Sequence, residues 1–213
     1  MDGEIDMKNG RSRQAINEDH DSSAQSLRLE LRTLWDEVDV LWEQSQGSDG
    51  FRGYVSADYD AVFRALVRLR RQALTFLEWG SGLGVVTIMA SRLGFEAYGI
   101  EHEPKLVAHA RAFGARYAPA ARFVCGNFFP NEFAWPPGEA KMTVRTAVHG
   151  AAAYERMGRK LSEFDLVYAY PWPEERQLYQ NVMHQCGGPH SLFLTYDVRR
   201  GIEVRRCRRP SHR

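Results

Sequence analysis

Apolar side chains recur along the N-terminal part of the chain at the spacing of an α-helix. Between Leu27 and Trp42 they return every three or four residues, which places them on one helical face. A second stripe of this kind runs from Tyr59 to Leu69, and Ser56 precedes it as the expected N-cap. The pattern therefore predicts two helices ahead of the rest of the chain.

The density of apolar residues divides the chain into three parts. Residues 1–22 are polar and rich in acidic groups, which predicts a disordered acidic tail. Residues 23–72 hold the two expected helices as an N-terminal extension. Residues 73–213 hold the remaining elements and are expected to form one domain, which suits a chain of 213 residues.

Beyond residue 73, short apolar runs alternate with helical patterns. The expected strands are 75–78, 96–101, 122–125, 165–170, 191–196 and 202–206. Strands separated by helices of this length predict an α/β fold of parallel βαβ units with right-handed crossovers. Only Asp197–Gly201 separates the last two strands, and that segment is too short for a helix. We therefore expect a direct hairpin there.

The overall charge favours neither nucleic acid nor a membrane as a partner, because the net charge is +1 and the pI is near 7.8. Arginines nevertheless gather near the C-terminus, at Arg199, Arg200, Arg205, Arg206, Arg208, Arg209 and Arg213. Such a segment contacts nucleic acid or an acidic partner, or it keeps an edge strand solvated. We favour the second interpretation and keep nucleic acid as an alternative partner.

The cysteines are few and widely spaced, at Cys125, Cys186 and Cys207, which predicts reduced thiols and a cytoplasmic location. The segment His184–His190 holds two histidines and a cysteine, but its spacing matches no common zinc pattern, so no metal site is expected. Residues 1–20 are polar throughout, and no apolar run approaches the ~20 residues of a membrane helix. Neither a signal peptide nor a membrane span is expected.

One glycine-rich segment lies between an apolar strand pattern and an apolar helix pattern. It runs from Glu78 to Gly84 as EWGSGLG. Alternating glycines let the backbone approach a ligand where a Cβ would collide, and the following helix offers free N–H groups. The nicotinamide fingerprint fails because Val85 occupies its third glycine position, and the phosphate-binding P-loop fails because no lysine follows.

The segment matches the pattern acidic-x-G-x-G-x-G and so resembles motif I of the class I S-adenosylmethionine (SAM) dependent methyltransferases. The resemblance implies a doubly wound, mostly parallel Rossmann-like sheet in the order 3-2-1-4-5, followed by a short antiparallel strand. It implies SAM as cofactor, bound by Glu78, Gly80, Ser81, Gly82 and Gly84, with the carboxylate facing the methionine amino group. The alternative is a glycine-rich turn that binds nothing.

Polar residues end the next two strands. The resemblance gives Glu101 the ribose hydroxyls, and gives Gly126 and Asn127 the adenine amino group. The alternatives are a helix-capping glutamate and an ordinary Gly-Asn turn. Phe128 is a further candidate for a ring beside the adenine.

The fourth strand ends in Tyr170-Pro171-Trp172, where this family faces its acceptor. The segment distantly resembles the D/N-P-P-Y/W motif of amino-group methyltransferases, but Ala169 replaces the polar residue. Tyr170 and Trp172 are the catalytic candidates, through cation–π attraction, or they simply pack between helix and loop. Tyr54, before the second helix, is proposed as part of a lid over the cofactor.

Three functions follow from these features. The first is a SAM-dependent methyltransferase for a small molecule or a protein side chain. The second is a nucleic-acid methyltransferase whose C-terminal arginines contact phosphates. The third is a non-catalytic SAM-binding protein, favoured by the missing polar acceptor at Ala169. The acceptor is not defined by any of these residues.

Overall fold

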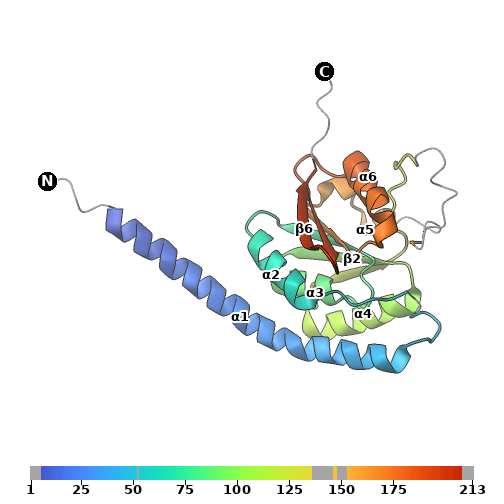
Figure 1. The fold of residues 1–213 in the computed structure, drawn as a ribbon, viewed down its shortest axis with the longest axis horizontal. Helices are drawn as coiled ribbons and strands as arrows, with labels where there is room; N and C mark the ends of the chain where they lie inside the picture. Colours follow the sequence, from blue (N-terminus) through green and yellow to red (C-terminus); the bar gives the residue numbers. More distant parts are fainter. Residues whose placement is uncertain (1–5, 52, 136–145, 148–152, 208–213) are drawn as a thin grey trace, which may run out of the picture.

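The computed structural model describes residues 6–51, 53–135, 146–147 and 153–207. Two helices come first and a sheet with interleaved helices follows (Figure 1). The elements are α1 (Asp6–Ser45), α2 (Tyr59–Leu69), β1 (Thr75–Trp79), α3 (Val85–Arg92), β2 (Glu96–Glu101), α4 (Pro104–Tyr117), β3 (Arg122–Cys125), α5 (Ala153–Met157), the short 3-10 helix η2 (Leu161–Glu163), β4 (Leu166–Ala169), the 3-10 helix η3 (Pro173–Glu175), α6 (Arg176–Cys186), β5 (Leu192–Asp197) and β6 (Gly201–Arg206).

The six strands form one sheet in the order β3-β2-β1-β4-β5-β6. All neighbouring pairs are parallel except β5 and β6, which pair antiparallel. This confirms the predicted Rossmann-like fold and its strand order. The expected hairpin is present as well, since Asp197 pairs with Gly201 at the turn between the last two strands. Strand order reverses between β1 and β4, which is where such a fold binds ligands.

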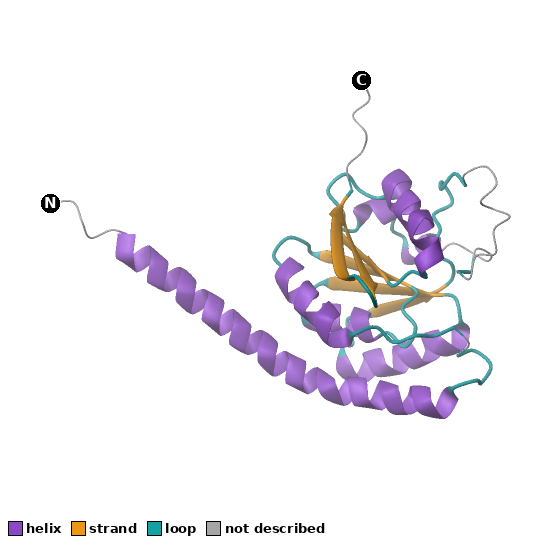
Figure 2. Ribbon diagram, viewed as in Figure 1, coloured by secondary structure: helices purple, strands orange, loops and turns teal. Residues whose placement is uncertain are grey.

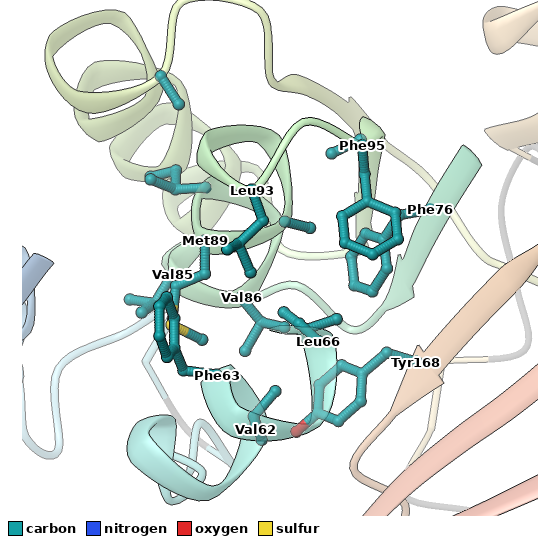
Figure 3. Close-up of a cluster of buried hydrophobic side chains, with 14 of the residues drawn as sticks. Val62, Phe63, Leu66, Phe76, Val85, Val86, Met89, Leu93, Phe95 and Tyr168 are labelled. Atoms are coloured by element: carbon teal, nitrogen blue, oxygen red, sulfur yellow. The ribbon is translucent and has the colours of Figure 1, made fainter. Parts of the chain in front are cut away.

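Helices cover both faces of the sheet (Figure 2). Helices α1 to α4 pack on one face, and α5 and α6 pack on the other. Neighbouring residues of a strand face opposite sides, so Phe76 of β1 lies in the first core and Leu77 in the second. Figure 3 shows Phe63 of α2 and Met89 of α3 among the side chains of the first core.

Helix α1 begins at Asp6, so residues 6–22 are helical in the structure rather than a disordered tail. Extending an existing helix costs far less than starting one, and the polar composition of this segment does not prevent it. The N-terminal end of α1 projects away from the rest of the protein (Figure 1). Its later turns are anchored, because Leu34 is fully buried and Glu37 accepts hydrogen bonds of 2.7 Å from both Arg116 and Tyr117 of α4.

The N-cap of α2 is Asp58, not Ser56 as predicted. The Asp58 carboxylate accepts the backbone N–H of Ala61 at 2.9 Å, which is the contact that stabilises a helix start. The Ser56 hydroxyl instead accepts from the hydroxyl of Tyr59 at 3.4 Å. Ser56 and Asp58 are both good capping residues and lie two positions apart, so the sequence pattern alone does not identify the N-cap.

Short 3-10 turns adjoin both helices of the second face. Helix α5 ends at Met157 and η2 follows it, while η3 leads directly into α6. Within the described ranges, no helix is both long and apolar enough to cross a membrane.

Candidate functional site

A cavity of about 930 Å³ opens at the carboxyl ends of the parallel strands, beside the reversal between β1 and β4. Its wall includes the turn before α2, the loop after β1, the ends of β2 and β3, the loop after β4, the first turn of α6 and the β5–β6 turn. Its volume lies in the range of pockets that enclose a cofactor or a small molecule. The topology therefore brings most of the predicted site residues to this cavity, while Glu78, Ser81 and Gly84 are not among the residues that line it.

The glycine loop is shaped so that side chains are excluded from it. Gly82 has φ +53°, and a Cβ there would lie 2.3 Å from the ring of Tyr54. Gly84 has φ +83°, and a Cβ there would lie 2.7 Å from the ring of Phe123. Gly80, which lines the cavity, has nothing within 4 Å of its Cβ position. The loop thus leaves open backbone at Gly80 and packs tightly at the two glycines that follow.

Glu78 and Ser81 lie beneath the loop, and their side chains do not line the cavity. The Glu78 carboxylate accepts the backbone N–H of Thr87 at 2.9 Å and its hydroxyl at 2.6 Å. Burial raises the pKa of Glu78 to about 8, although both hydrogen bonds oppose that shift. The cause is local: β1 continues to Trp79, so Glu78 points to a sheet face instead of the sheet edge. The Ser81 hydroxyl is buried against Gly99 of β2.

Glu101 lies at the cavity, at the end of β2. One carboxylate oxygen accepts the backbone N–H of Gly82 at 2.9 Å, and the other accepts the backbone N–H of Glu103 at 2.9 Å. Glu103 in turn caps α4, because its carboxylate accepts the backbone N–H of Lys105 at 3.2 Å. Capping therefore belongs to Glu103, while Glu101 joins the glycine loop to the strand beside it.

Gly126 and Asn127 also line the cavity. The side-chain oxygen of Asn127 accepts the backbone N–H of Phe129 at 3.0 Å, which is a turn contact. Its backbone oxygen accepts from Ala153 of α5 at 2.9 Å. The turn interpretation of Asn127 is thus visible in the structure, and its predicted contact with adenine stays a prediction.

Aromatic rings form one wall of the cavity, and the sequence patterns did not predict this wall. The rings of Trp79 and Phe128 stack with centroids 4.6 Å apart and an interplanar angle of 12°, and Tyr179 of α6 lies against both. The Trp79 indole N–H donates to the hydroxyl of Tyr154 at 2.9 Å. Their positions offered a signal, because Trp79 directly follows the predicted strand 75–78 and Phe128 lies in the loop after the predicted strand 122–125.

Tyr170 and Trp172 line the other end of the cavity, as predicted from the end of β4. The rings of Tyr170 and Tyr196 meet edge to face, with centroids 5.1 Å apart. Burial raises the pKa of Tyr170, so its hydroxyl stays protonated near neutral pH. Nearby Glu175 is buried and accepts from the backbone and hydroxyl of Thr146 at 3.0 and 2.5 Å.

The ring of Tyr54 packs on Gly82 of the glycine loop and lines the cavity, and its predicted role as a lid stays a prediction. Its hydroxyl is 2.9 Å from that of Tyr59, and its ring packs edge-on against Trp42 of α1. The preceding turn is attached to α4, because the Lys105 ammonium donates to the backbone oxygen of Asp49 at 2.9 Å. The segment between the two N-terminal helices therefore forms part of the cavity wall through Gly53, Tyr54 and Val55.

The β5–β6 turn adds charged groups that sequence reasoning did not assign to the site. One carboxylate oxygen of Asp197 accepts the backbone N–H groups of Arg199 and Arg200 at 2.8 and 2.7 Å. The other forms an ion pair with Arg176 of α6. All four residues line the cavity. Among the described residues, no group of three or more histidine, cysteine or acidic side chains is arranged to hold a metal ion.

No protein-family model matches the chain, and no curated protein matches it. Solved structures similar to it include an RNA methyltransferase from Salinibacter ruber in complex with S-adenosyl-L-homocysteine, at 22% identity and a TM-score of 0.46, covering 67% of this chain and 78% of that one. An O-methyltransferase from Bacillus cereus in complex with the same molecule has 13% identity and a TM-score of 0.49, covering 82% and 67%. A putative caffeoyl-CoA O-methyltransferase from Staphylococcus aureus has 14% identity and a TM-score of 0.49, covering 78% and 72%. The fold assignment rests on the strand order of the sheet itself.

Proposed function

We propose that this protein binds SAM and transfers its methyl group to an acceptor bound in the same cavity. The observation that carries the proposal is that two chemically different sets of residues line the same cavity. The glycine loop and Glu101 form one wall, and Tyr170 and Trp172 form the other. Direct displacement requires two ligands to be aligned at short range and shielded from water, and a shared cavity provides this.

The residues of the first wall fit an adenosyl cofactor. Open backbone at Gly80 allows a close approach, and the Trp79–Phe128 stack offers an aromatic surface beside it. The Glu101 carboxylate already accepts two backbone N–H groups. A carboxylate has about four lone-pair sites, so it retains capacity for ribose hydroxyls. Bound SAM supplies a methyl group activated by its sulfonium.

The residues of the second wall contribute alignment more than proton transfer. The Glu175 carboxylate is hydrogen-bonded to Thr146. The Asp197 carboxylate forms an ion pair with Arg176 and accepts hydrogen bonds from the backbone of the β5–β6 turn. A raised pKa makes Tyr170 a poor base near neutral pH. The geometry therefore suits an acceptor atom that is already nucleophilic when it binds.

Calorimetry with SAM and with S-adenosylhomocysteine tests the cofactor half of the proposal. We expect both to bind, and we expect Glu101→Gln to weaken binding about tenfold, which is about 1.4 kcal/mol. The matched control is Glu203→Gln, because Glu203 lies on β6, outside the cavity lining, and pairs with Arg205. Absence of binding by both molecules to the unmodified protein would overturn the proposal.

Methyl transfer is tested by incubating the protein with methyl-labelled SAM and a cell extract, with Glu101→Gln as the comparison, which should label less at a SAM concentration below the Kd of the variant. Label in a small-molecule or protein fraction supports the proposed reaction. Label in the nucleic-acid fraction supports the second function considered from sequence. Cofactor binding without labelling of any fraction supports the non-catalytic alternative, which the loss of a polar residue at Ala169 favours.

A further inference from the structure

Charged groups divide between the two ends of the cavity. Glu101 and Glu103 lie at the end formed by β2. Arg176, Arg199 and Arg200 lie at the end formed by α6 and the β5–β6 turn. An elongated ligand that filled the cavity would therefore meet carboxylates at one end and guanidinium groups at the other. This division gives each end a preferred sign of ligand charge.

At the basic end of the cavity, the carboxylate of Asp197 is bonded to other groups of the protein. Asp197 accepts the backbone N–H groups of Arg199 and Arg200 and pairs with the side chain of Arg176. Its charge is therefore offset by Arg176. Within the described part of the chain, the guanidinium groups of Arg199 and Arg200 have no ion-pair partner, and both residues are solvent-exposed.

From this arrangement we propose that the methyl acceptor is a small aromatic or planar molecule bearing a phosphate or carboxylate group, which Arg199 and Arg200 bind. The inference rests on the proposed function. Arginine suits this task because its planar fork donates two parallel hydrogen bonds to either anion. The rings of Tyr170 and Trp172 line the space between these arginines and the cofactor wall, where they would contact the rest of the molecule.

The turn that carries the two arginines is held in place at both ends. Asp197 and Gly201 form a register pair of the antiparallel ladder, and Gly201 has φ +72°, a conformation that favours glycine. The backbone N–H groups of the turn are bonded to Asp197, whose other oxygen is tied to α6. The backbone positions of Arg199 and Arg200 are therefore set before a ligand arrives, which reduces the entropy cost of binding.

A small molecule fits the charge pattern better than a nucleic acid does. A polyanion gains affinity from a row of unpaired cations along its path. Among the described lining residues, the arginines without an ion-pair partner lie at one end, and the opposite end presents Glu101 and Glu103. On the neighbouring strand, Arg205 is paired with Glu203 at 2.7 Å. The basic groups thus match one localised anion.

Calorimetry with defined probes tests the inference, with and without bound S-adenosylhomocysteine. The probes are phenyl phosphate and benzoate as anions, phenol as the neutral analogue, and phenyltrimethylammonium as the cation. We expect phenyl phosphate or benzoate to bind at least about tenfold more tightly than the other two, and comparison of the two anions distinguishes phosphate from carboxylate. The preferred anion should bind more weakly in 0.5 M salt than at low salt, because the arginines are exposed.

The double variant Arg199→Gln/Arg200→Gln should lower the affinity for the anion about tenfold or more. The matched double variant Arg205→Gln/Arg206→Gln removes two arginines that do not line the cavity and should change it less than about twofold. Equal or tighter binding of phenol or phenyltrimethylammonium, an unchanged affinity in the first variant, or no binding of any probe would overturn the inference. So would a short single-stranded RNA that binds more tightly than phenyl phosphate and loses affinity equally in both variants.

Affinity for S-adenosylhomocysteine is measured on the same samples, so the two proposals can fail separately. Retained cofactor binding without anion binding would remove this inference and leave the proposed function intact. Anion binding without cofactor binding would overturn the proposed function, and with it the assignment of the anion as a methyl acceptor, and would leave only an anion site at Arg199 and Arg200. Thermal unfolding of each variant shows whether it is folded, and the salt dependence of the unmodified protein tests the inference without any variant.

Discussion

The two ends of the cavity are built in different ways. The cofactor end is formed largely by backbone atoms. Gly80, Gly82 and Gly84 form the loop, and the Glu101 carboxylate accepts a backbone N–H of that loop. At the other end, side chains from three separate elements meet: Tyr170 follows β4, Arg176 begins α6, and Asp197 ends β5. A backbone site depends on local sequence and is preserved as a unit. A side-chain site can change one residue at a time, so its ligand is harder to deduce from sequence.

The largest effect expected at the backbone end is on stability. Gly84→Ala places a Cβ 2.7 Å from the Phe123 ring at a positive φ, so strain and overpacking act together. We expect the free energy of unfolding to fall by about 2–4 kcal/mol in urea denaturation. Gly158→Ala is the matched control, because its φ is +64° with nothing within 4 Å, and it should cost only about 1–2 kcal/mol. Equal losses in the two variants would contradict tight packing at Gly84.

The buried carboxyl beneath the loop predicts a pH dependence of stability. The pKa of Glu78 is about 8 in the folded protein, against an ordinary value of 4.5. Between these values the folded protein holds a proton that the unfolded chain has lost, so its contribution to stability falls as pH rises from 4.5 to 8. The slope is at most about 1.4 kcal/mol per pH unit.

Urea denaturation of the unmodified protein and of Glu78→Gln, from pH 5 to pH 8, measures this contribution. The difference in free energy of unfolding between the two proteins should shift in favour of the variant as pH rises. Glu203→Gln is the control, since Glu203 is on the surface of β6. A difference that stays constant with pH would contradict the raised pKa.

Tyr54 connects the cofactor end to the N-terminal helices, and its removal tests that connection. Tyr54→Ala deletes the ring that covers Gly82. We expect the affinity for S-adenosylhomocysteine, measured by calorimetry, to fall about three- to tenfold. Tyr54→Phe keeps the ring and loses the hydroxyl with its contacts to Tyr59 and Ser56, so it should change the affinity less than about threefold. An unchanged affinity in Tyr54→Ala would remove the lid hypothesis.

The smallest expected effect is the one that most directly tests the separation of the two ends. Arg199→Gln/Arg200→Gln should leave the affinity for S-adenosylhomocysteine within about twofold of the unmodified protein. The reason is that both residues belong to the β5–β6 turn, whose backbone N–H groups are bonded to Asp197 and not to the glycine loop. A loss of tenfold or more in calorimetry would mean that the cavity acts as one coupled site.

The fold could be predicted almost completely because each of its signals is local. Apolar runs bounded by glycine and proline located every strand to within about a residue, and strand-helix alternation limited the topology. The start of α1 was wrong because composition was used to judge a helix that continues from a well-packed segment. The N-cap of α2 was wrong because Ser56 and Asp58 are both good caps.

The site could be predicted only as a set of positions. Strand-end residues do gather around one cavity, but the direction of each side chain depends on where its strand ends. Glu78 lies within β1, one residue earlier than the edge, and so it faces Thr87. The pairing of Arg176 with Asp197 joins two elements that no sequence motif connects. Contacts of this kind require the assembled sheet.

The direct turn between β5 and β6 also has a consequence for how the protein can be redesigned or can diverge. Asp197 and Gly201 fix the ladder on either side of it, so Val198, Arg199 and Arg200 can be exchanged without shifting the register. Most of the contact with the acceptor's charge would then depend on three consecutive codons. Randomising those codons alone gives a small library in which acceptor preference varies while the folded scaffold stays constant.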